Sequence, residues 1–328
     1  MRPIKWDGKE LWVLDQRLLP TREKWVKISS PEDAFKAIRD MVIRGAPLIG
    51  VVAAFGLAFS DSFEKSRVKE KAEMLKKARP TAINLAWAVD RVYRRVISSK
   101  NPRIDALREA EKIMKEEERR ARAIGEYGEP LIENGDVVLT HCNAGSLATI
   151  EYGTALAPLR VAKEKGKEVK VIATETRPVM QGARLTTYEL LKDGFDVTLI
   201  PDTVVGYLMY LRKVNKVIVG ADRVLRDGHV VNKIGTYQIA VLAKRHDIPF
   251  YVALPSSTFD PHTNLNDVEI EERSPLEVIY IKGRRIAPKD VKVFNPAFDI
   301  TPPELVTAFI TDKGLIYPPF EENLTKLL

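Results

Sequence analysis

The chain has 328 residues, of which 45% are hydrophobic and 30% are charged, and its formal net charge is +7. This length and composition predict a globular protein with two domains, each able to bury its own core. Acidic and basic residues are interleaved, so the charge gives no indication of a nucleic-acid-binding surface. The single cysteine excludes an internal disulfide framework and a zinc site built on cysteine pairs, and it fits a reducing compartment.

The sequence also argues against a membrane protein and against a bound cofactor. The N-terminus lacks the apolar core of a signal peptide, and the longest apolar run, residues 46–59, is shorter than the roughly 20 residues that span a bilayer. We therefore expect a cytoplasmic protein that binds no membrane. No metal-ligand spacing joins the histidines, and neither G-x-G-x-x-G nor a Walker motif follows a predicted strand. We expect no metal, NAD or ATP.

The first part of the chain is predicted to be a short β-hairpin followed by helices. Residues 4–14 alternate around Asp7-Gly8, which favours a hairpin turn. Ser30 and Pro31 are typical of an N-cap and a first helical residue, and Gly45 is expected to end that helix. Further helices are predicted over residues 47–62, 64–78, 81–98 and 103–124.

After residue 125 the pattern changes to short β-rich runs separated by helical stretches. This alternation predicts βαβ units and a parallel sheet. We therefore expect an α/β protein: a mainly helical N-terminal domain with a small β start over residues 1–126, and a Rossmann-like, doubly wound domain over residues 127–328. The predicted strands lie at residues 137–139, 169–173, 197–200, 217–219 and 250–254.

Polar residues follow several of these strands. Ligands of doubly wound sheets bind at the carboxyl ends of the strands, so these residues are candidates for a binding site. We expect a thiol and three carboxyl groups to gather there, from Cys142, Glu175, Asp202 and Asp222.

Cys142 stands at the end of a predicted strand, before an Asn-Ala-Gly-Ser turn. A helix is predicted to open at Gly145-Ser146, where its free N–H groups would stabilise a thiolate and hold a phosphate. From position alone, an inert buried cysteine is an equal alternative. His141 is adjacent on the strand and points to the opposite face, so a pair of His141 and Cys142 is not expected. His229, His246 and His262 stay open as partners, and nothing in the sequence selects one of them.

Asp222 ends another predicted strand. It is interpreted either as a helix cap or partner of Arg223, or as a carboxyl group held partly out of water that donates a proton. The following residues predict a hairpin that turns on Asp227-Gly228 and returns Asn232 and Lys233 to the same edge.

Two arginines at helix junctions and one glutamine complete the candidate set. Arg44 precedes Gly45-Ala46-Pro47, and Arg79 precedes a proline and a threonine; both positions suit a phosphate near helix N–H groups. We expect these arginines to close over a ligand held by the other domain. Gln181, in a polar loop after a strand, is able to bond a sugar hydroxyl or a phosphate.

A series of short motifs runs nearly from end to end of the chain: Leu14–Pro20, Ile43–Pro47, Arg79–Leu85, Thr140–Gly145, Glu175–Pro178, Gln181–Thr186, Gly220–Arg223, Asn232–Tyr237 and Phe294–Glu304. Taken together and in this order, they resemble the 5-methylthioribose-1-phosphate isomerase family. That family also contains the regulatory subunits of translation initiation factor 2B. The number of motifs in order makes the match specific.

The resemblance implies a homodimer that interconverts an aldose 1-phosphate and a ketose 1-phosphate in methionine salvage, without metal or cofactor. It implies that Asp222 is the proton donor and Cys142 the second catalytic group. The chain departs from the family pattern at Leu225–Val231, which touches no catalytic position. The positions that match substrate-binding residues of the family are Arg44, Gly45, Ala46, Arg79, Gln181, Asn232 and Lys233.

Two alternatives stay open at this stage. A ribose-1,5-bisphosphate isomerase shares the catalytic pair, but its substrate needs a second phosphate site where a methylthio group needs an apolar wall; Leu14–Pro20 and Arg79–Leu85 favour the methylthio enzyme. A non-catalytic regulatory subunit that binds initiation factor 2 would have no reason to keep both Cys142 and Asp222. The expected partner is a small sugar phosphate, not nucleic acid.

Overall fold

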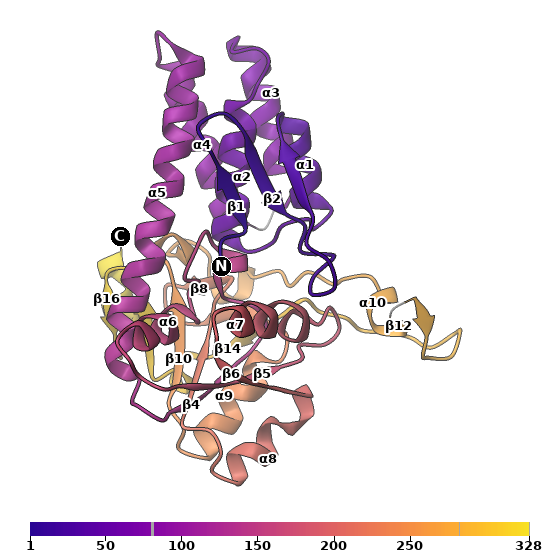
Figure 1. Ribbon diagram of the computed structural model, residues 1–328, viewed down its shortest axis with the longest axis vertical. Helices are drawn as coiled ribbons and strands as arrows, with labels where there is room; N and C mark the ends of the chain where they lie inside the picture. The colour runs from indigo at the N-terminus through magenta and orange to yellow at the C-terminus, as the bar shows by residue number, and fades with distance from the viewer. Residues whose placement is uncertain (80–81, 282, 328) are drawn as a thin grey trace.

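The computed structural model describes residues 1–79, 82–281 and 283–327, and it shows a helical layer above a sheet domain (Figure 1). The chain starts with an antiparallel sheet in the order β1-β2-β3, so the predicted hairpin is confirmed and a third strand joins it. These strands are Ile4–Trp6, Leu11–Leu14 and Trp25–Ile28.

In the described part of the next hundred residues, five helices follow, in close agreement with the predicted ranges. Ser30 caps α1 by accepting a hydrogen bond from the Asp33 N–H at 3.1 Å. Helix α2 lies at the centre of the bundle, and all of its residues after Ala46 are buried. The helices are α1 (Pro31–Arg39), α2 (Ala46–Ala58), α3 (Lys65–Lys76), α4 (Ile83–Ile97) and α5 (Pro102–Gly128).

One predicted helix end was wrong. Helix α1 ends at Arg39, and Gly45 instead precedes α2 as its N-cap, with φ of 98°. A left-handed backbone of this kind is open to glycine and strained for other residues. Gly45 therefore starts a helix here rather than ending one.

Helix α5 connects the two layers. Its 27 residues pack against α2 and α4 in the helical layer and against α6 (Ala157–Glu164) and β15 (Ala308–Thr311) in the sheet domain. The predicted division at residue 126 falls inside this helix, and it stays a prediction.

The large sheet has the order β16-β15-β10-β7-β4-β5-β6, in which all strands except β16 run parallel. Within this sheet the chain first forms β4, and β5 and β6 then add to one side of it. The next strand, β7, lies on the other side of β4. This reversal is the topological switch point of a doubly wound sheet, so the predicted Rossmann-like fold is confirmed. The other strands are Val137–Thr140 (β4), Lys170–Thr174 (β5), Asp196–Ile200 (β6), Lys216–Val219 (β7), Phe250–Leu254 (β10) and Gly314–Ile316 (β16).

Both faces of this sheet are covered. Side chains alternate along β4, so Leu139 packs with α8 (Val205–Tyr210) and α9 (Thr236–Arg245), while Val138 packs with α5, α6 and α7 (Thr187–Lys192). A short helix, α11 (Phe320–Asn323), lies near the C-terminus. Among the described residues, no helix combines the length and apolar character needed to cross a membrane.

A smaller sheet, in the order β11-β8-β9-β14, lies beside the large one. It contains the predicted hairpin, in which the Leu225 N–H donates to the His229 carbonyl at 2.9 Å. The described residues of 261–281 and 283–297, here called the arm, connect β11 to β14, and the part that contains α10 and β12 projects to the side (Figure 1). The bounds are β8 (Arg223–Leu225), β9 (Val230–Lys233), β11 (Phe259–Asp260), α10 (Leu276–Ile279), β12 (Tyr280–Ile281), β13 (Arg284–Arg285) and β14 (Phe298–Thr301).

Candidate active site

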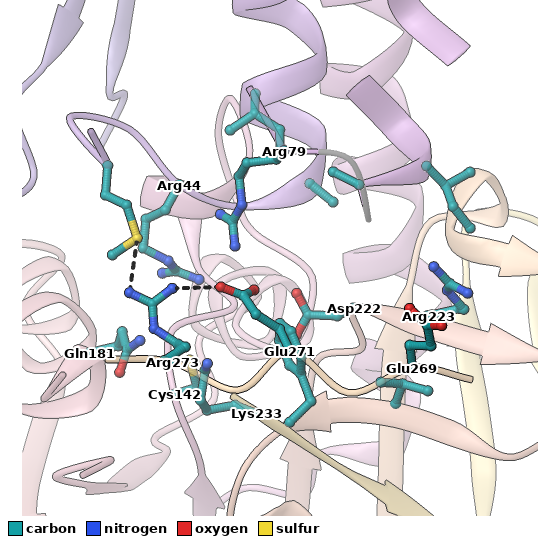
Figure 2. Close-up of a pocket in the computed structure, with 18 of the residues that line it drawn as sticks. Arg44, Arg79, Cys142, Gln181, Asp222, Arg223, Lys233, Glu269, Glu271 and Arg273 are labelled. Atoms are coloured by element: carbon teal, nitrogen blue, oxygen red, sulfur yellow. Dashed lines mark hydrogen bonds and ion pairs between the residues drawn. The ribbon is translucent and has the colours of Figure 1, made fainter. Parts of the chain in front are cut away.

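Cys142 and Asp222 lie on either side of the switch point. Cys142 follows β4 and Asp222 follows β7, and these two strands are neighbours in the sheet. Both residues line a cavity between the sheet domain and the helical layer, into which Arg79 points from the helical side (Figure 2). The crevice at the switch point is where doubly wound sheets bind their ligands.

The cavity brings together all of the predicted site residues except Asn232. Asn232 is 5% exposed, and its side-chain amide donates to the Thr236 hydroxyl at 3.0 Å instead of lining the cavity. The two residues after Arg79, predicted as part of its junction, lie outside the described residues. The predicted residues that line the cavity are Arg44, Gly45, Ala46, Arg79, Cys142, Gln181, Asp222 and Lys233.

The backbone of Cys142 has a left-handed conformation, with φ of 62°. Its N–H donates to the Thr176 hydroxyl at 2.9 Å, and its carbonyl accepts from the Thr186 hydroxyl at 2.6 Å. A non-glycine residue adopts this conformation only where its surroundings fix it. Cys142, 8% exposed, is therefore held with its side chain at a set position at the cavity wall.

The predicted helix after Cys142 was wrong. Only a three-residue 3₁₀ turn, Ser146–Ala148, forms there. The Ser146 N–H donates to the Glu189 carboxylate at 2.7 Å, so it does not hold a phosphate. The Asn-Ala-Gly-Ser sequence has the composition of a helix start, but a carboxylate from 43 residues further along the chain takes its donor.

His141 has a structural role. It is buried, and burial lowers the pKa of its imidazole, so the ring is neutral near pH 7. One ring nitrogen lies 2.8 Å from the Ile234 carbonyl and must donate to it; the other, 2.6 Å from the Thr174 hydroxyl, accepts. Both nitrogens are engaged away from Cys142, as the strand alternation predicts.

Arg44 connects the helical layer to the loop after Cys142. Its guanidinium donates to the side-chain oxygen of Asn143 at 2.7 Å and to the Asn143 carbonyl at 2.8 Å. A Cβ on the neighbouring Gly45 would lie 2.2 Å from the Ala148 carbonyl oxygen. The two layers therefore approach more closely here than a side chain at position 45 allows.

The cavity holds several partly buried cations. Burial lowers the pKa of Arg79, and Arg44 and Arg273 lower it further, while Asp222 and Glu271 oppose them. Burial also lowers the pKa of Lys233, whose ammonium donates to the Ala297 carbonyl at 2.8 Å. Such an environment disfavours charge in the free protein and favours an anionic ligand.

The sequence analysis missed the residues that the arm contributes. Glu269, Glu271 and Arg273 line the cavity, together with Met41 from the α1–α2 loop. Arg273 lies 3.3 Å from Glu271 and 3.9 Å from the Met41 sulfur, and these contacts are drawn in Figure 2. The alternation of acidic and apolar residues over 268–272 was the available signal, but it resembles an ordinary exposed strand.

Of the three carboxyl groups expected at the strand ends, only Asp222 lines the cavity. Asp202 instead accepts hydrogen bonds from the backbone N–H groups of Thr176 and Arg177 at 2.8 and 2.7 Å. It thereby holds the loop whose Thr176 hydroxyl contacts Cys142. Within the described residues, no group of three or more His, Cys, Asp or Glu side chains is arranged to hold a metal ion.

The fold and this cavity together define an α/β protein with a site for a small anionic molecule between its two layers. The family model described as the initiation factor 2 subunit family matches residues 42–318, and the chain belongs to this family.

Its relatives carry two kinds of name. A methylthioribose-1-phosphate isomerase of Thermosipho africanus is 53% identical, over 99% of this chain and 97% of its own. The crystal structure of 5-methylthioribose 1-phosphate isomerase from Pyrococcus horikoshii is 42% identical, with a TM-score of 0.93 over 99% of this chain and 95% of that one. A structure from A. fulgidus, described as translation initiation factor eIF-2B, subunit delta, is 48% identical, with a TM-score of 0.90 over 100% and 99%.

Proposed function

We propose that this protein is an aldose–ketose isomerase that converts 5-methylthioribose 1-phosphate to 5-methylthioribulose 1-phosphate in methionine salvage. Relatives at 53% and 42% identity that carry this isomerase name support the proposal. The observation that carries it is the placement of Cys142 and Asp222 after neighbouring strands, in the wall of one cavity. The rest of the cavity suits the parts of this substrate.

The chemistry requires an acid before it requires a base. The anomeric carbon of the substrate is phosphorylated, so the ring does not open as in a free sugar. In our proposal, Asp222 gives a proton to the ring oxygen and the C1–O bond of the ring breaks, which leaves a cationic C1 that still carries the phosphate. One hydrogen then moves from C2 to C1. Either the Cys142 thiolate takes it from C2 as a proton, which gives an enol, and returns it to C1, or it crosses directly as a hydride while Cys142 polarises the site. In both routes the C2 hydroxyl gives its proton to the Asp222 carboxylate as the C2 ketone forms, which restores the acid.

The phosphate is assigned to the cations of the cavity, Arg44, Arg79 and Lys233, beside the backbone of Gly45 and Ala46. The side-chain oxygen of Gln181 is buried and has no hydrogen-bond partner among the described residues, so it is free to accept a substrate hydroxyl. Asn232 acts indirectly in this proposal: its bond to Thr236 fixes the end of the strand that carries Lys233.

The remainder of the cavity favours a methylthio group over a second phosphate. Apolar side chains line it beside the cations, and two carboxylates, Glu269 and Glu271, face the same space. An apolar wall stabilises a thioether by burial. The two carboxylates, of which Glu271 is already paired with Arg273 at 3.3 Å, add negative charge that disfavours a 5-phosphate. A ribose-1,5-bisphosphate isomerase is therefore the weaker candidate. The apolar residues are Ile49, Ala82, Ile83, Val231 and Val268.

The A. fulgidus relative described as an initiation-factor subunit raises the non-catalytic alternative. A regulatory subunit needs an exposed surface for its partner, and nothing in that role requires a thiol and an acid in one enclosed site. The presence of Cys142 and Asp222 in the same cavity favours catalysis.

The test is turnover of 5-methylthioribose 1-phosphate and ribose 1,5-bisphosphate in parallel, by the unmodified chain and by Cys142→Ser and Asp222→Asn. We expect the methylthio sugar to react, and each variant to lose about 10²- to 10⁴-fold in kcat with little change in KM. Near-normal turnover by either variant would exclude the role assigned to that residue. Deuterium at C2 separates the routes, because wash-out to solvent indicates proton transfer and full retention at C1 indicates a hydride shift.

We infer that the protein acts in the cytoplasm, as a homodimer, without nucleic acid. The dimer is supported by the family resemblance and by exposed apolar residues at the β6 edge, on α8 and directly after α8. These are Leu199, Tyr207, Tyr210 and Leu211, which are 48%, 64%, 70% and 39% exposed. Exposed apolar groups at a free sheet edge are typical of a contact with a second copy.

A further inference from the structure

A fully buried carboxylate lies behind the loop that follows Cys142. Glu189, on α7, has no exposed surface. Its carboxylate accepts from the Asn143 side-chain amide at 2.5 Å, from the Ser146 N–H at 2.7 Å and from the Ser146 hydroxyl at 2.8 Å. A Cβ on Gly145 would lie 2.2 Å from this carboxylate, so a glycine is needed for its close approach.

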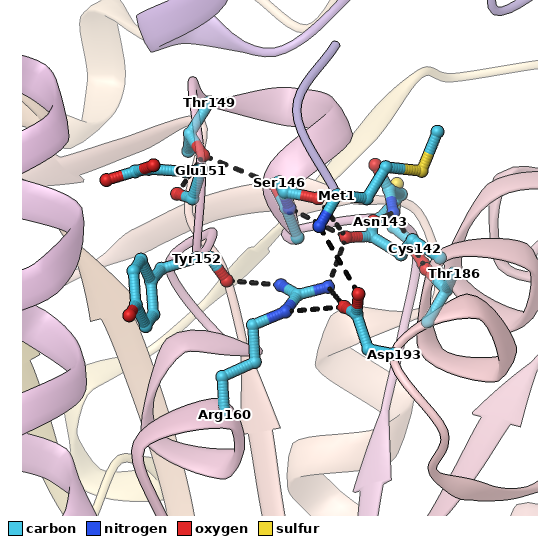
Figure 3. Close-up of polar contacts among 12 residues, drawn as sticks. Met1, Cys142, Asn143, Ser146, Thr149, Glu151, Tyr152, Arg160, Thr186 and Asp193 are labelled. Carbon is cyan, nitrogen blue, oxygen red and sulfur yellow. Dashed lines mark hydrogen bonds and ion pairs between the residues drawn. The ribbon is translucent and has the colours of Figure 1, made fainter. Parts of the chain in front are cut away.

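Arg160 balances the charge of this carboxylate. Its side chain is 8% exposed, and the guanidinium donates to Glu189 at 2.7 Å and to Asp193 at 2.8 and 2.6 Å. Figure 3 shows it facing Asp193, with Asn143 and Ser146 nearby. A buried ion pair adds little net stability, because desolvation offsets the attraction, whereas removing one partner is costly. The position of this ion pair beside the candidate site therefore points to a role other than stability.

The contacts of Glu189 reach both Cys142 and Arg44. Because the Asn143 NH₂ group donates to Glu189, the side-chain oxygen of Asn143 faces the other way and accepts from Arg44. The Thr186 hydroxyl accepts from the same NH₂ group at 3.1 Å and donates to the Cys142 carbonyl. The Glu189 carboxylate thus orients the Asn143 amide, and this amide contacts two groups. One is Arg44, which is assigned to the phosphate, and the other is the Thr186 hydroxyl, which holds the Cys142 carbonyl.

We propose that Glu189, held by Arg160, is a positioning residue for the isomerase reaction. It locks the loop of residues 142–146 so that the strained Cys142 backbone directs its thiol, and Arg44 its guanidinium, toward the same sugar phosphate. The proposal rests on the role assigned to Cys142 above. It predicts that loss of the charge on Glu189 disturbs the geometry of catalysis more than it disturbs the fold.

The test uses Glu189→Gln, which keeps the shape but presents an NH₂ group where an acceptor is needed. We expect kcat to fall about 10- to 100-fold, the usual effect of a small misplacement of catalytic groups, with a smaller change in KM. Cys142 is the only cysteine, so alkylation by iodoacetamide reports on it alone. We expect alkylation of the folded variant to be several-fold faster, because the loop no longer encloses the thiol.

Asp136→Asn is the matched control. Asp136 precedes β4, at the end opposite Cys142, and pairs with Lys216 at 2.6 Å; the two side chains are 6% and 11% exposed. This variant also breaks a buried ion pair, between the residue before β4 and the first residue of β7. We expect it to lose stability but to keep the kcat and the alkylation rate of the unmodified chain.

A second pair of variants applies if Glu189→Gln does not fold. Thr186→Val removes the hydroxyl that contacts Cys142 and Asn143, and Thr186→Ser keeps it. We expect the valine variant to lose kcat and to alkylate faster, and the serine variant to restore both. Folded Glu189→Gln or Thr186→Val protein with unchanged kcat and alkylation would overturn the proposal. If the unmodified chain turns over neither sugar phosphate, the proposed function fails, while the alkylation rates still decide whether Glu189 fixes Cys142.

Discussion

Asp299 is a carboxyl group whose burial affects the pH dependence of stability. One of its oxygens accepts from the N–H groups of Gly235 and Tyr237 at 2.7 and 3.2 Å, at the start of α9. Its other oxygen is buried and has no hydrogen-bond partner among the described residues. Burial raises the pKa of Asp299 to about 6, although the backbone N–H groups oppose the change.

We predict that Asp299→Asn changes stability in a pH-dependent way. Because the pKa rises from 3.8 to about 6 on folding, the native state binds more protons than the unfolded state between these values. The contribution of Asp299 therefore becomes unfavourable as pH rises through this window, by roughly 3 kcal/mol above pH 7. Asparagine does not titrate. Between pH 4 and pH 7.5, the free energy of unfolding of the variant, measured with urea, should therefore rise by about this much relative to that of the unmodified chain. A difference that does not vary with pH would contradict the assignment.

At the scale of elements, Gly45 is the residue at which the start of α2 packs against the 3₁₀ turn that follows Cys142. We predict that Gly45→Ala destabilises the protein by more than about 3 kcal/mol, since the left-handed φ of 98° costs about 1–2 kcal/mol and the new Cβ would meet the Ala148 oxygen at 2.2 Å. Turnover should fall as well, because Arg44 and the Cys142 loop move apart. Urea unfolding and a kinetic assay measure both effects.

Gly8→Ala is the control for this substitution. Gly8 has a similar φ of 93°, but a Cβ there has no neighbour within 4 Å. Gly8→Ala should lower the free energy of unfolding by about 1–2 kcal/mol, because it adds backbone strain alone, and it should leave kcat unchanged. Equal losses in the two variants would mean that the contact between the layers at Gly45 contributes nothing.

The elements that local sequence determines were predictable. The Ser30 cap and Pro31 placed the start of α1, and Asp227-Gly228 placed the β8–β9 turn. The errors arose where distant residues decide the structure. The turn after Cys142 has the sequence of a helix start, but Glu189 takes its donor. The alternation over residues 268–272 of the arm is that of an ordinary exposed strand, so only the contacts of the arm with Met41 and with the cavity place Glu271 and Arg273 in the candidate site.

At the scale of the whole molecule, the site exists only where the two layers meet. The helical layer supplies Arg44 and Arg79, and the sheet domain supplies Cys142 and Asp222. Among the described residues, no carboxylate forms an ion pair with Arg79, and burial lowers its pKa. The free protein therefore keeps a charge that an anionic ligand would stabilise, and binding should stabilise both layers together.

We predict that Arg79→Met separates stability from function. Methionine fills a similar space without charge, so the free variant should unfold at the same or a higher urea concentration than the unmodified chain. Its KM should rise about 10- to 100-fold, because a charged hydrogen bond to the phosphate is lost. A ligand at about 100 times its Kd should stabilise the unmodified chain by about 2.7 kcal/mol and, at the same concentration, the variant much less.

Arg22→Met, at an exposed position of the N-terminal segment, should change neither the unfolding midpoint nor KM. If Arg79→Met instead destabilised the free protein by several kcal/mol and kept its KM, Arg79 would serve to hold the layers together. The excess positive charge of the cavity would then belong to the fold and not to a ligand. A stable free variant with weak binding would mean the reverse: the layers meet without Arg79, and the buried charge is retained for the phosphate.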